Sequence, residues 1–192
     1  MNTEVTTEML EKEKPDAVII ATGAKPLVLP IPGINDSGII HAVDLLDGKA
    51  SCGEKVLVVC GGMVGGETAD FLGEQGHDVT VIELREKIGA DIISEHRKFL
   101  MKDFEEYKIK EVTNAKVAKF FEGGVAYTLT DGSEHSLEGF DSVVLAMGAR
   151  NYDPLSEKVK EIVKETYVLG DAVRARRALD ATAEAMEIAM KL

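Results

Sequence analysis

Residues 55–83 read KVLVVCGGMVGGETADFLGEQGHDVTVIE, and this stretch decides the fold. Its start, residues 55–60, is a short valine-rich apolar run, typical of a strand buried on both faces. Apolar residues then recur near helical spacing from Val64 to Gln75, and Gly76 follows where a helix would end. A second apolar run, Val79–Ile82, leads to an acidic residue. Strand, glycine turn, helix and strand in this order predict a βαβ unit of a parallel sheet.

The turn between the first strand and the helix is rich in glycine. Residues 60–65, CGGMVG, follow the G-x-G-x-x-G pattern except that Cys60 stands at the first glycine. Such glycines allow a tight turn and the close approach of a pyrophosphate, while the helix start supplies free N–H donors. The alternative is a turn whose small residues only let helix and strand pack. We expect a dinucleotide pyrophosphate to be bound here by Gly61, Gly62, Met63, Val64 and Gly65.

Glu83 is the acidic residue at the end of the second strand, 23 positions beyond Cys60. At this place a carboxylate can accept hydrogen bonds from the adenosine ribose and would repel a 2′-phosphate, which favours NAD over NADP. Arg85 lies nearby and could accommodate that phosphate, so NADP remains the alternative. A solvated charge at a strand end is the other interpretation of Glu83.

The remaining middle of the chain predicts more of the same α/β domain. Asp91–Tyr107 has one apolar helical face and an acidic start, and Asp141–Met147 is another buried strand, ending before Gly148. Between them, Lys110–Leu137 has short strand signals separated by glycine turns, typical of an antiparallel meander. We therefore expect a Rossmann-like fold: a parallel sheet with helices, plus a meander.

The sequence also repeats part of itself. Asp16–Lys25, DAVIIATGAK, is echoed by Asp141–Arg150, DSVVLAMGAR, and repetition in matching order indicates two related domains. Only the second copy is preceded by a glycine turn, so we expect the other domain to lack its opening strand, loop and helix. The predicted organisation is a complete NAD(P)-binding domain at 48–150, inserted between partial FAD-binding segments at 1–47 and 151–192.

Composition excludes several classes of function. The chain has 192 residues, 45% of them apolar, enough to bury a core. Its formal charge of −12 argues against a nucleic-acid partner, because binding to phosphate backbones depends on Lys and Arg. Neither a long apolar run nor an apolar leader occurs, so we expect a cytoplasmic protein without a membrane partner.

Side chains suited to metal binding or acid–base catalysis are sparse. Cys52 and Cys60, eight positions apart, form neither a CxxC pair nor a thiol cluster, so we expect no metal site. The four histidines lack a pattern that would orient a base, and we interpret them as surface residues: His41, His77, His96 and His135. We expect no catalytic side chain, because hydride transfer is carried out by cofactors.

The ordered set of motifs resembles flavoproteins with paired FAD and NAD(P) domains. It comprises ATGA at 21–24, VVCGGMVGGE at 58–67, VIE at 81–83, AMGA at 146–149 and LGDA at 169–172. The chain is similar throughout to the carboxyl-terminal region of NADH:flavin oxidoreductases of the 2-enoate reductase, 2,4-dienoyl-CoA reductase and trimethylamine dehydrogenase type.

That resemblance implies further site residues. Thr22-Gly23 and Met147-Gly148 would be strand-end turns near the two dinucleotides, with Gly148 facing NAD. Gly170-Asp171 matches the segment whose acid holds the ribityl chain of FAD, and Arg174–Leu192 would be the following helix. The alternative for Gly170-Asp171 is an ordinary helix N-cap.

The resemblance also implies a function and partners. The parent enzyme would pass hydride from NADH to FAD, and electrons onward to a second flavin and an organic acceptor such as an activated alkene. We expect the chain by itself to be inactive in this reaction. The expected partners are a dinucleotide and the remaining flavin-domain and FMN-barrel portions of that parent. The rival interpretation is a non-catalytic nucleotide-binding or assembly fragment, inactive by itself and forming a homo-oligomer through exposed sheet edges.

Overall fold

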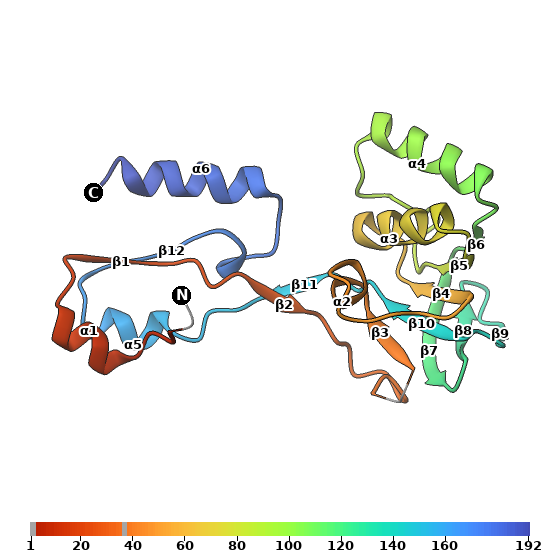
Figure 1. Cartoon of the computed structure of the whole chain (residues 1–192), viewed down its shortest axis with the longest axis horizontal. Coiled ribbons are helices and arrows are strands. Elements are labelled where there is room, and N and C mark those ends of the chain that lie inside the picture. The colour runs from red at the N-terminus through yellow and green to blue at the C-terminus, as the bar shows by residue number, and fades with distance from the viewer. Residues whose placement is uncertain (1–2, 36–37) are drawn as a thin grey trace. The chain divides into compact units, whose positions relative to one another are not determined.

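The structure is a computed structural model that describes residues 3–35 and 38–192. The chain forms two compact units (Figure 1). We call Pro26–Gly148 the continuous unit, and Met1–Lys25 together with Ala149–Leu192 the divided unit. The predicted domain boundaries after residues 47 and 150 stay a prediction.

A parallel sheet forms the centre of the continuous unit. Its strand order is β3-β10-β4-β5-β6, and every neighbouring pair is parallel. Strand β4 lies in the middle because its residues are apolar on both faces, as the valine-rich run predicts. The strands are β3 (Ile39–His41), β4 (Lys55–Val59), β5 (Asp78–Ile82), β6 (Lys110–Val112) and β10 (Ser142–Leu145).

Alternate residues of β4 enter two separate cores. Val56 and Val58 pack in the cluster that contains side chains of helices α3 and α4, whereas Leu57 and Val59 pack in the cluster that contains the meander. The sheet is therefore the middle of three layers, with helices on one side and a second sheet on the other (Figure 1). The helices of this unit are α2 (Ala42–Leu46), α3 (Met63–Glu74) and α4 (Ser94–Glu106).

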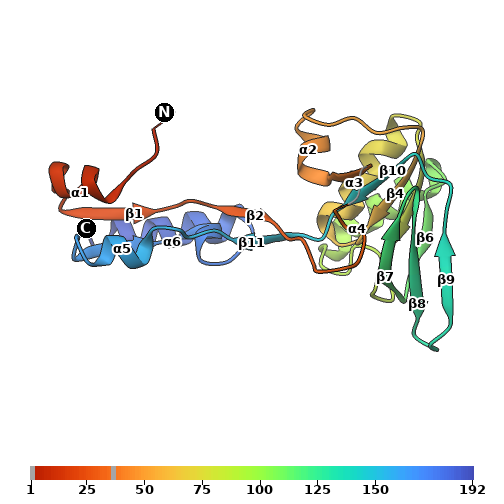
Figure 2. The ribbon, with the colours of Figure 1, turned by 90° about the horizontal axis from the view of Figure 1, so that it is seen from below.

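The predicted antiparallel meander is present on the face of the parallel sheet opposite α3 and α4 (Figure 2). Both of its turns contain a glycine with positive φ, 68° at Gly123 and 86° at Gly132, as expected for tight hairpins. Its strands are β7 (Ala115–Phe121), β8 (Gly124–Leu129) and β9 (Glu134–Leu137). Together with the parallel sheet, this arrangement confirms the predicted α/β, Rossmann-like class.

Two boundaries in the continuous unit differ from the prediction. Residues 110–112 were expected in the meander, but they pair with β5 and extend the parallel sheet. This short strand, β6, forms the edge of the sheet next to β5. Helix α4 begins at Ser94 rather than Asp91, because residues 84–93 form a loop in which Gly89 has φ of 64°.

The divided unit has a smaller core around two parallel strands, β1 (Ala17–Ile20) and β12 (Glu165–Val168). Leu10 of α1 (Thr7–Glu13) and Val159 of α5 (Ser156–Lys160) are buried against Ile20. The helix expected from Arg174 begins only at Ala178, after the 3-10 turn η1 (Gly170–Ala172), and forms α6 (Ala178–Ala189).

The repeated motif takes the same local structure in both copies. Strands β1 and β10 are each followed by a turn that ends in a left-handed glycine, with φ of 76° at Gly23 and 83° at Gly148. Strands β2 (Ala24–Pro26) and β11 (Ala149–Asn151) come next and pair with each other. The backbone N–H of Leu27 donates to Gly148 at 3.0 Å, and that of Tyr152 donates to Gly23 at 2.9 Å. The two hydrogen bonds occupy equivalent positions of the repeat.

Candidate dinucleotide site

The glycine turn links β4 to α3, with Gly62 as the helix N-cap. Gly62 has no side chain to bind the first N–H groups of the helix, and no side-chain cap hydrogen bond is formed there. Cys60 has φ of 78°, a left-handed conformation that favours glycine. The first glycine of the motif is therefore replaced at a position that retains the conformation of glycine, and the Cys60 side chain packs against the meander-side core.

Gly61 and Gly65 are required for packing within the turn. A Cβ on Gly65 would overlap the carbonyl oxygen of Cys60, and one on Gly61 would overlap the buried side chain of Ile88. By contrast, a Cβ on Gly62 would meet only the carboxylate of Asp91, at 3.3 Å. The turn thus needs two glycines for its own structure and has a third, Gly62, that faces the Asp91 carboxylate.

Glu83 is buried, with 7% of its surface exposed. One carboxylate oxygen accepts the N–H of Gly61 at 2.6 Å, and the other accepts the N–H of Arg85 at 2.7 Å. Glu83 therefore braces the glycine turn against the end of β5. Each oxygen keeps a second lone pair that can accept from a ligand hydroxyl. The interpretation of Glu83 as a merely solvated charge is wrong.

A pocket of about 330 Å³ lies above the carboxyl ends of β4, β5 and β10, where open α/β sheets bind ligands. Six predicted residues line it: Gly62, Met63, Val64, Glu83, Arg85 and Gly148. Gly61 and Gly65 do not line it and act through the turn. The other lining residues are Cys60, Leu84, Asp91, Ala146 and Met147. The sequence analysis missed Leu84 and Asp91 as site residues. Both lie in a loop without sequence periodicity, so the sequence does not show which of its side chains lie near the glycine turn.

The Cys60 thiol is not suited to nucleophilic chemistry. Burial, and secondarily the nearby Glu83 carboxylate, raise its pKa to about 11, although Arg85 opposes the shift. The thiol is therefore neutral at pH 7 and adds no charge to the pocket.

The divided unit contains a second pocket, of about 320 Å³. Among the residues that line it are the predicted Gly23, Gly170 and Asp171. Asp171 accepts the N–H of Arg176 at 3.0 Å and does not cap α6, whose N-cap is Arg177. The helix-cap alternative for Asp171 is therefore wrong.

The polar groups around this second pocket bind one another. Glu184 accepts the N–H of Gly170 at 2.7 Å and forms an ion pair with Arg176. Thr22 does not line the pocket; its hydroxyl donates to the carbonyl of Tyr152.

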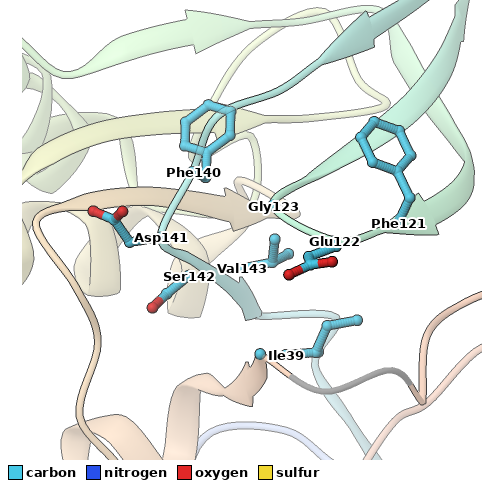
Figure 3. A pocket seen from close by; sticks show the side chains of 9 residues that line it. Ile39, Phe121, Glu122, Gly123, Phe140, Asp141, Ser142 and Val143 are labelled. Atoms are coloured by element: carbon cyan, nitrogen blue, oxygen red, sulfur yellow. The ribbon is translucent and has the colours of Figure 1, made fainter.

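A third pocket, of about 410 Å³, lies at the opposite, amino end of β10 (Figure 3). It contains no predicted site residue. Asp141 accepts the N–H of Lys55 at 2.8 Å, and Ser142 accepts that of Gly53 at 3.0 Å. These two polar side chains therefore bind backbone N–H groups at and just before the start of β4, so their hydrogen bonds are structural.

Within residues 3–35 and 38–192, no group of three or more His, Cys, Asp or Glu side chains could hold a metal ion. None of the helices in that part of the chain is long and apolar enough to cross a membrane. His96 and His135 are exposed, whereas His41 and His77 are half-buried. His77 contacts the carbonyl oxygen of Gly53 through Nδ1 at 2.9 Å, so its role is structural.

A βαβ glycine turn with a buried acid, in a chain that also has a second unit with the same strand-end turn, defines the class of paired dinucleotide-binding proteins. Residues 2–172 match the family model of pyridine nucleotide-disulphide oxidoreductases, and the chain belongs to this family. The predicted relationship to paired-domain flavoproteins is confirmed, as are NAD(H) and FAD as the cofactors of the fold.

Several relatives and solved structures are similar over nearly the whole chain. An NADH oxidase of Thermoanaerobacter brockii is 31% identical over 96% of this chain, and a cinnamate reductase of Clostridium sporogenes is 28% identical over 100%. The structure of a 2-naphthoyl-CoA reductase in complex with 2-naphthoyl-CoA matches 100% of the chain with a TM-score of 0.91 and 30% identity. The chain spans 29% of each of these three proteins.

Proposed function

We propose that the continuous unit binds NAD(H) and is the electron-entry module of a flavin-dependent oxidoreductase. The observation that carries this proposal is one pocket that joins the uncapped start of α3 to the buried carboxylate of Glu83. The first feature suits a pyrophosphate and the second suits a ribose diol. When bound, NADH supplies a hydride to the flavin.

The residues present fit such a ligand. Gly62 leaves room for a phosphate at the helix start, and Met63 and Val64 line the pocket beside it. Glu83 is held by two backbone N–H groups, so its orientation is fixed before the ligand arrives. Gly148 and Met147 border the pocket from the end of β10.

Glu83 also supports a preference for NAD over NADP. Its carboxylate is buried at the strand end, where a 2′-phosphate would meet a negative charge. Arg85 is the nearest cation lining the pocket, and its backbone N–H is already committed to Glu83. Its exposed guanidinium is the group that would admit NADP.

In the complete oxidoreductase, Gly170 and Asp171 would contribute to FAD binding, and the final acceptor would be an enoate, dienoyl or similar organic compound. The names of two relatives, a cinnamate reductase and a 2-naphthoyl-CoA reductase, support an unsaturated acid derivative as acceptor. Another relative is named an NADH oxidase, which supports NADH as the donor.

The rival function is a nucleotide-binding or assembly module without catalysis. The chain spans 29% of each of these three relatives, so the two functions are separated by an assay of flavin-dependent NADH consumption on the chain combined with the remaining portions of such an oxidoreductase. Flavin-dependent NADH consumption supports the oxidoreductase. Saturable NADH binding with no flavin-dependent turnover in this assembly favours the rival.

NADH binding itself is tested by fluorescence titration of the full chain and its Gly62→Ala variant. The new methyl group would meet only the Asp91 carboxylate, which must shift by a few tenths of an ångström, and it would occupy the phosphate-facing side of the turn, so binding should weaken about tenfold or more. Glu86→Gln is the control, because it changes an exposed side chain of the same unit that does not line the pocket. No saturable binding up to the millimolar range, or equal affinity for Gly62→Ala, would contradict the proposal.

A further inference from the structure

Asp91 is the one carboxylate besides Glu83 that lines the dinucleotide pocket. We propose that Asp91 opposes the pyrophosphate of NAD(H) and thereby keeps the affinity of the site low, so that the dinucleotide exchanges readily. The inference rests on the proposed NAD(H) site and adds a residue that sets its affinity.

The position of Asp91 is defined relative to the glycine turn. Its Oδ2 lies 3.3 Å, and its Oδ1 3.5 Å, from the point where Gly62 would carry a Cβ. The carboxylate thus faces the backbone that a pyrophosphate must approach. It lies at the positive end of α3, where a carboxylate and a phosphate are attracted by the same N–H groups.

The loop that carries Asp91 is fastened to the glycine turn. The N–H of Gly89 donates to the carbonyl of Gly61 at 2.7 Å, and the fully buried Ile88 packs on Gly61. Arg97 in α4 donates through Nε to the carbonyl of Ile88 at 2.6 Å. Asp91 lies two residues after Gly89, so this anchored segment places its backbone beside the turn.

Asp91 forms no ion pair within residues 3–35 and 38–192. Arg85, the cation that lines the pocket, is opposed there by Glu83 as well. A bound pyrophosphate would therefore face an uncompensated negative charge. Because Asp91 is exposed, water screens this repulsion in part, and we expect it to weaken binding about five- to tenfold.

The experiment compares NADH binding to the full chain and to its Asp91→Asn and Glu86→Gln variants. Asparagine keeps the size of the side chain and removes its charge. Glu86 is an exposed carboxylate of the same loop that does not line the pocket, so Glu86→Gln removes the same charge at a different place. Affinity is measured by fluorescence titration at low salt and near physiological salt, and folding is checked by thermal unfolding.

Asp91→Asn should bind NADH about five- to tenfold more tightly at low salt, and Glu86→Gln should resemble the unaltered chain. Added salt should reduce the difference between Asp91→Asn and the unaltered chain, because it screens the repulsion that only the latter contains. This salt effect is not expected from a change in packing.

Three results would overturn the proposal. Weaker binding by Asp91→Asn would show that the carboxylate accepts hydrogen bonds from the dinucleotide. Unchanged binding would show that it only stabilises the loop or helix start, and an equal gain in Glu86→Gln would show that position does not matter. Failure of all three proteins to bind NADH would instead refute the underlying NAD(H) site.

Discussion

The continuous and divided units contain the same strand-end turn but differ in the state of their polar groups. In the continuous unit the start of α3 is uncapped, and its N–H groups are available to a ligand. In the divided unit the N–H of Gly170 is bound by Glu184, and Asp171 accepts the N–H of Arg176. A common turn therefore occurs in both units, while the helix start without a side-chain cap distinguishes the unit that we propose binds the pyrophosphate.

This difference also concerns how each pocket is built. The continuous unit fixes Glu83 with two backbone donors and buries it between the sheet and the turn. The divided unit relies on an ion pair between Arg176 and Glu184, whose side chains are each 29% exposed. Hydrogen bonds to a buried charge hold geometry more strictly than a partly exposed ion pair does. We expect substitutions in the first pocket to have the larger effects.

The largest effect is expected from Gly65→Val. Its Cβ would overlap the Cys60 carbonyl oxygen, so the turn or the start of α3 must move. We expect a loss of more than about 3 kcal/mol in the free energy of unfolding and no measurable NADH binding. Urea unfolding and fluorescence titration measure the two quantities.

Gly170→Ala provides the matched change in the divided unit. Gly170 has φ of 62°, and its Cβ would lie 3.1 Å from that of Ala181. The expected cost is about 1–2 kcal/mol, from backbone strain, with NADH affinity unchanged. If Gly170→Ala abolished NADH binding while Gly65→Val preserved it, the two sites would have been assigned to the wrong units.

Glu83→Gln should have the next largest effect. A glutamine has one acceptor oxygen, so one of the two backbone N–H groups now bound by Glu83 would lose its partner inside the protein. The expected cost is about 1.5–3 kcal/mol of stability. The affinity for NADH should fall about tenfold. The affinity for NADPH should fall less, because the substitution removes the negative charge that faces the 2′-phosphate of NADPH.

Parallel titrations with NADH and NADPH test this, with Glu86→Gln as the control that leaves the pocket intact. If the unaltered chain already prefers NADPH, Arg85 rather than Glu83 decides cofactor choice.

The sequence predicted the parts of this site that depend on local pattern. Strand β4, the glycine turn, α3 and β5 follow from valine content, helical spacing and the position of glycines, and they carry most of the pocket. Asp91 and the second role of Glu83 could not be predicted, because both depend on a loop that folds back onto the turn through Ile88 and Gly89. The placement of β6 was wrong for a similar reason: its partner strand lies far away in the sequence.

Cys60→Gly should change the free energy of unfolding less than the substitutions above. This variant restores the first glycine of the motif, which Cys60 replaces in this chain. Glycine would relieve the left-handed backbone strain, worth about 1–2 kcal/mol, but would lose the packing of the thiol and gain freedom in the unfolded chain. The net change in stability should stay within about 1 kcal/mol. Cys60→Ala keeps the strain without the thiol, so it should be less stable than Cys60→Gly by about 1 kcal/mol in urea unfolding. Equal stability of the two variants would show that the backbone at this position is not strained.

The smallest expected effects concern the pH dependence of stability. One carboxylate in each unit should change that unit's stability with pH, and the two changes should have opposite sign. Asp70 in α3 has a pKa raised above its ordinary value, chiefly by burial and then by Asp103, Glu74 and Glu67. One of its oxygens, Oδ1, is buried without a hydrogen-bond partner in the described structure. In the divided unit, the ion pair with Arg176 and the N–H of Gly170 lower the pKa of Glu184.

The sign of each effect follows from which state binds the proton more tightly. Folded Asp70 binds its proton more tightly than unfolded Asp70 does. Its contribution to the stability of the fold therefore falls as the pH rises from about 3.8 through the folded pKa, and the full loss of stability is present at pH 7. Asp70→Asn should therefore stabilise the continuous unit at neutral pH, by about 0.5 kcal/mol, the scale of like-charge pairs on a helix, and should bring no gain at strongly acidic pH.

Glu184 stabilises the divided unit at pH values above its unfolded pKa, and this contribution is lost as the pH falls through its folded pKa. Glu184→Gln should therefore weaken the divided unit at neutral pH and have little effect on its stability in acid. Amide hydrogen exchange at pH 4 and pH 7, which reports on each unit separately, measures both changes; a gain from Asp70→Asn that is equal at the two pH values would show that its carboxylate is not the cause.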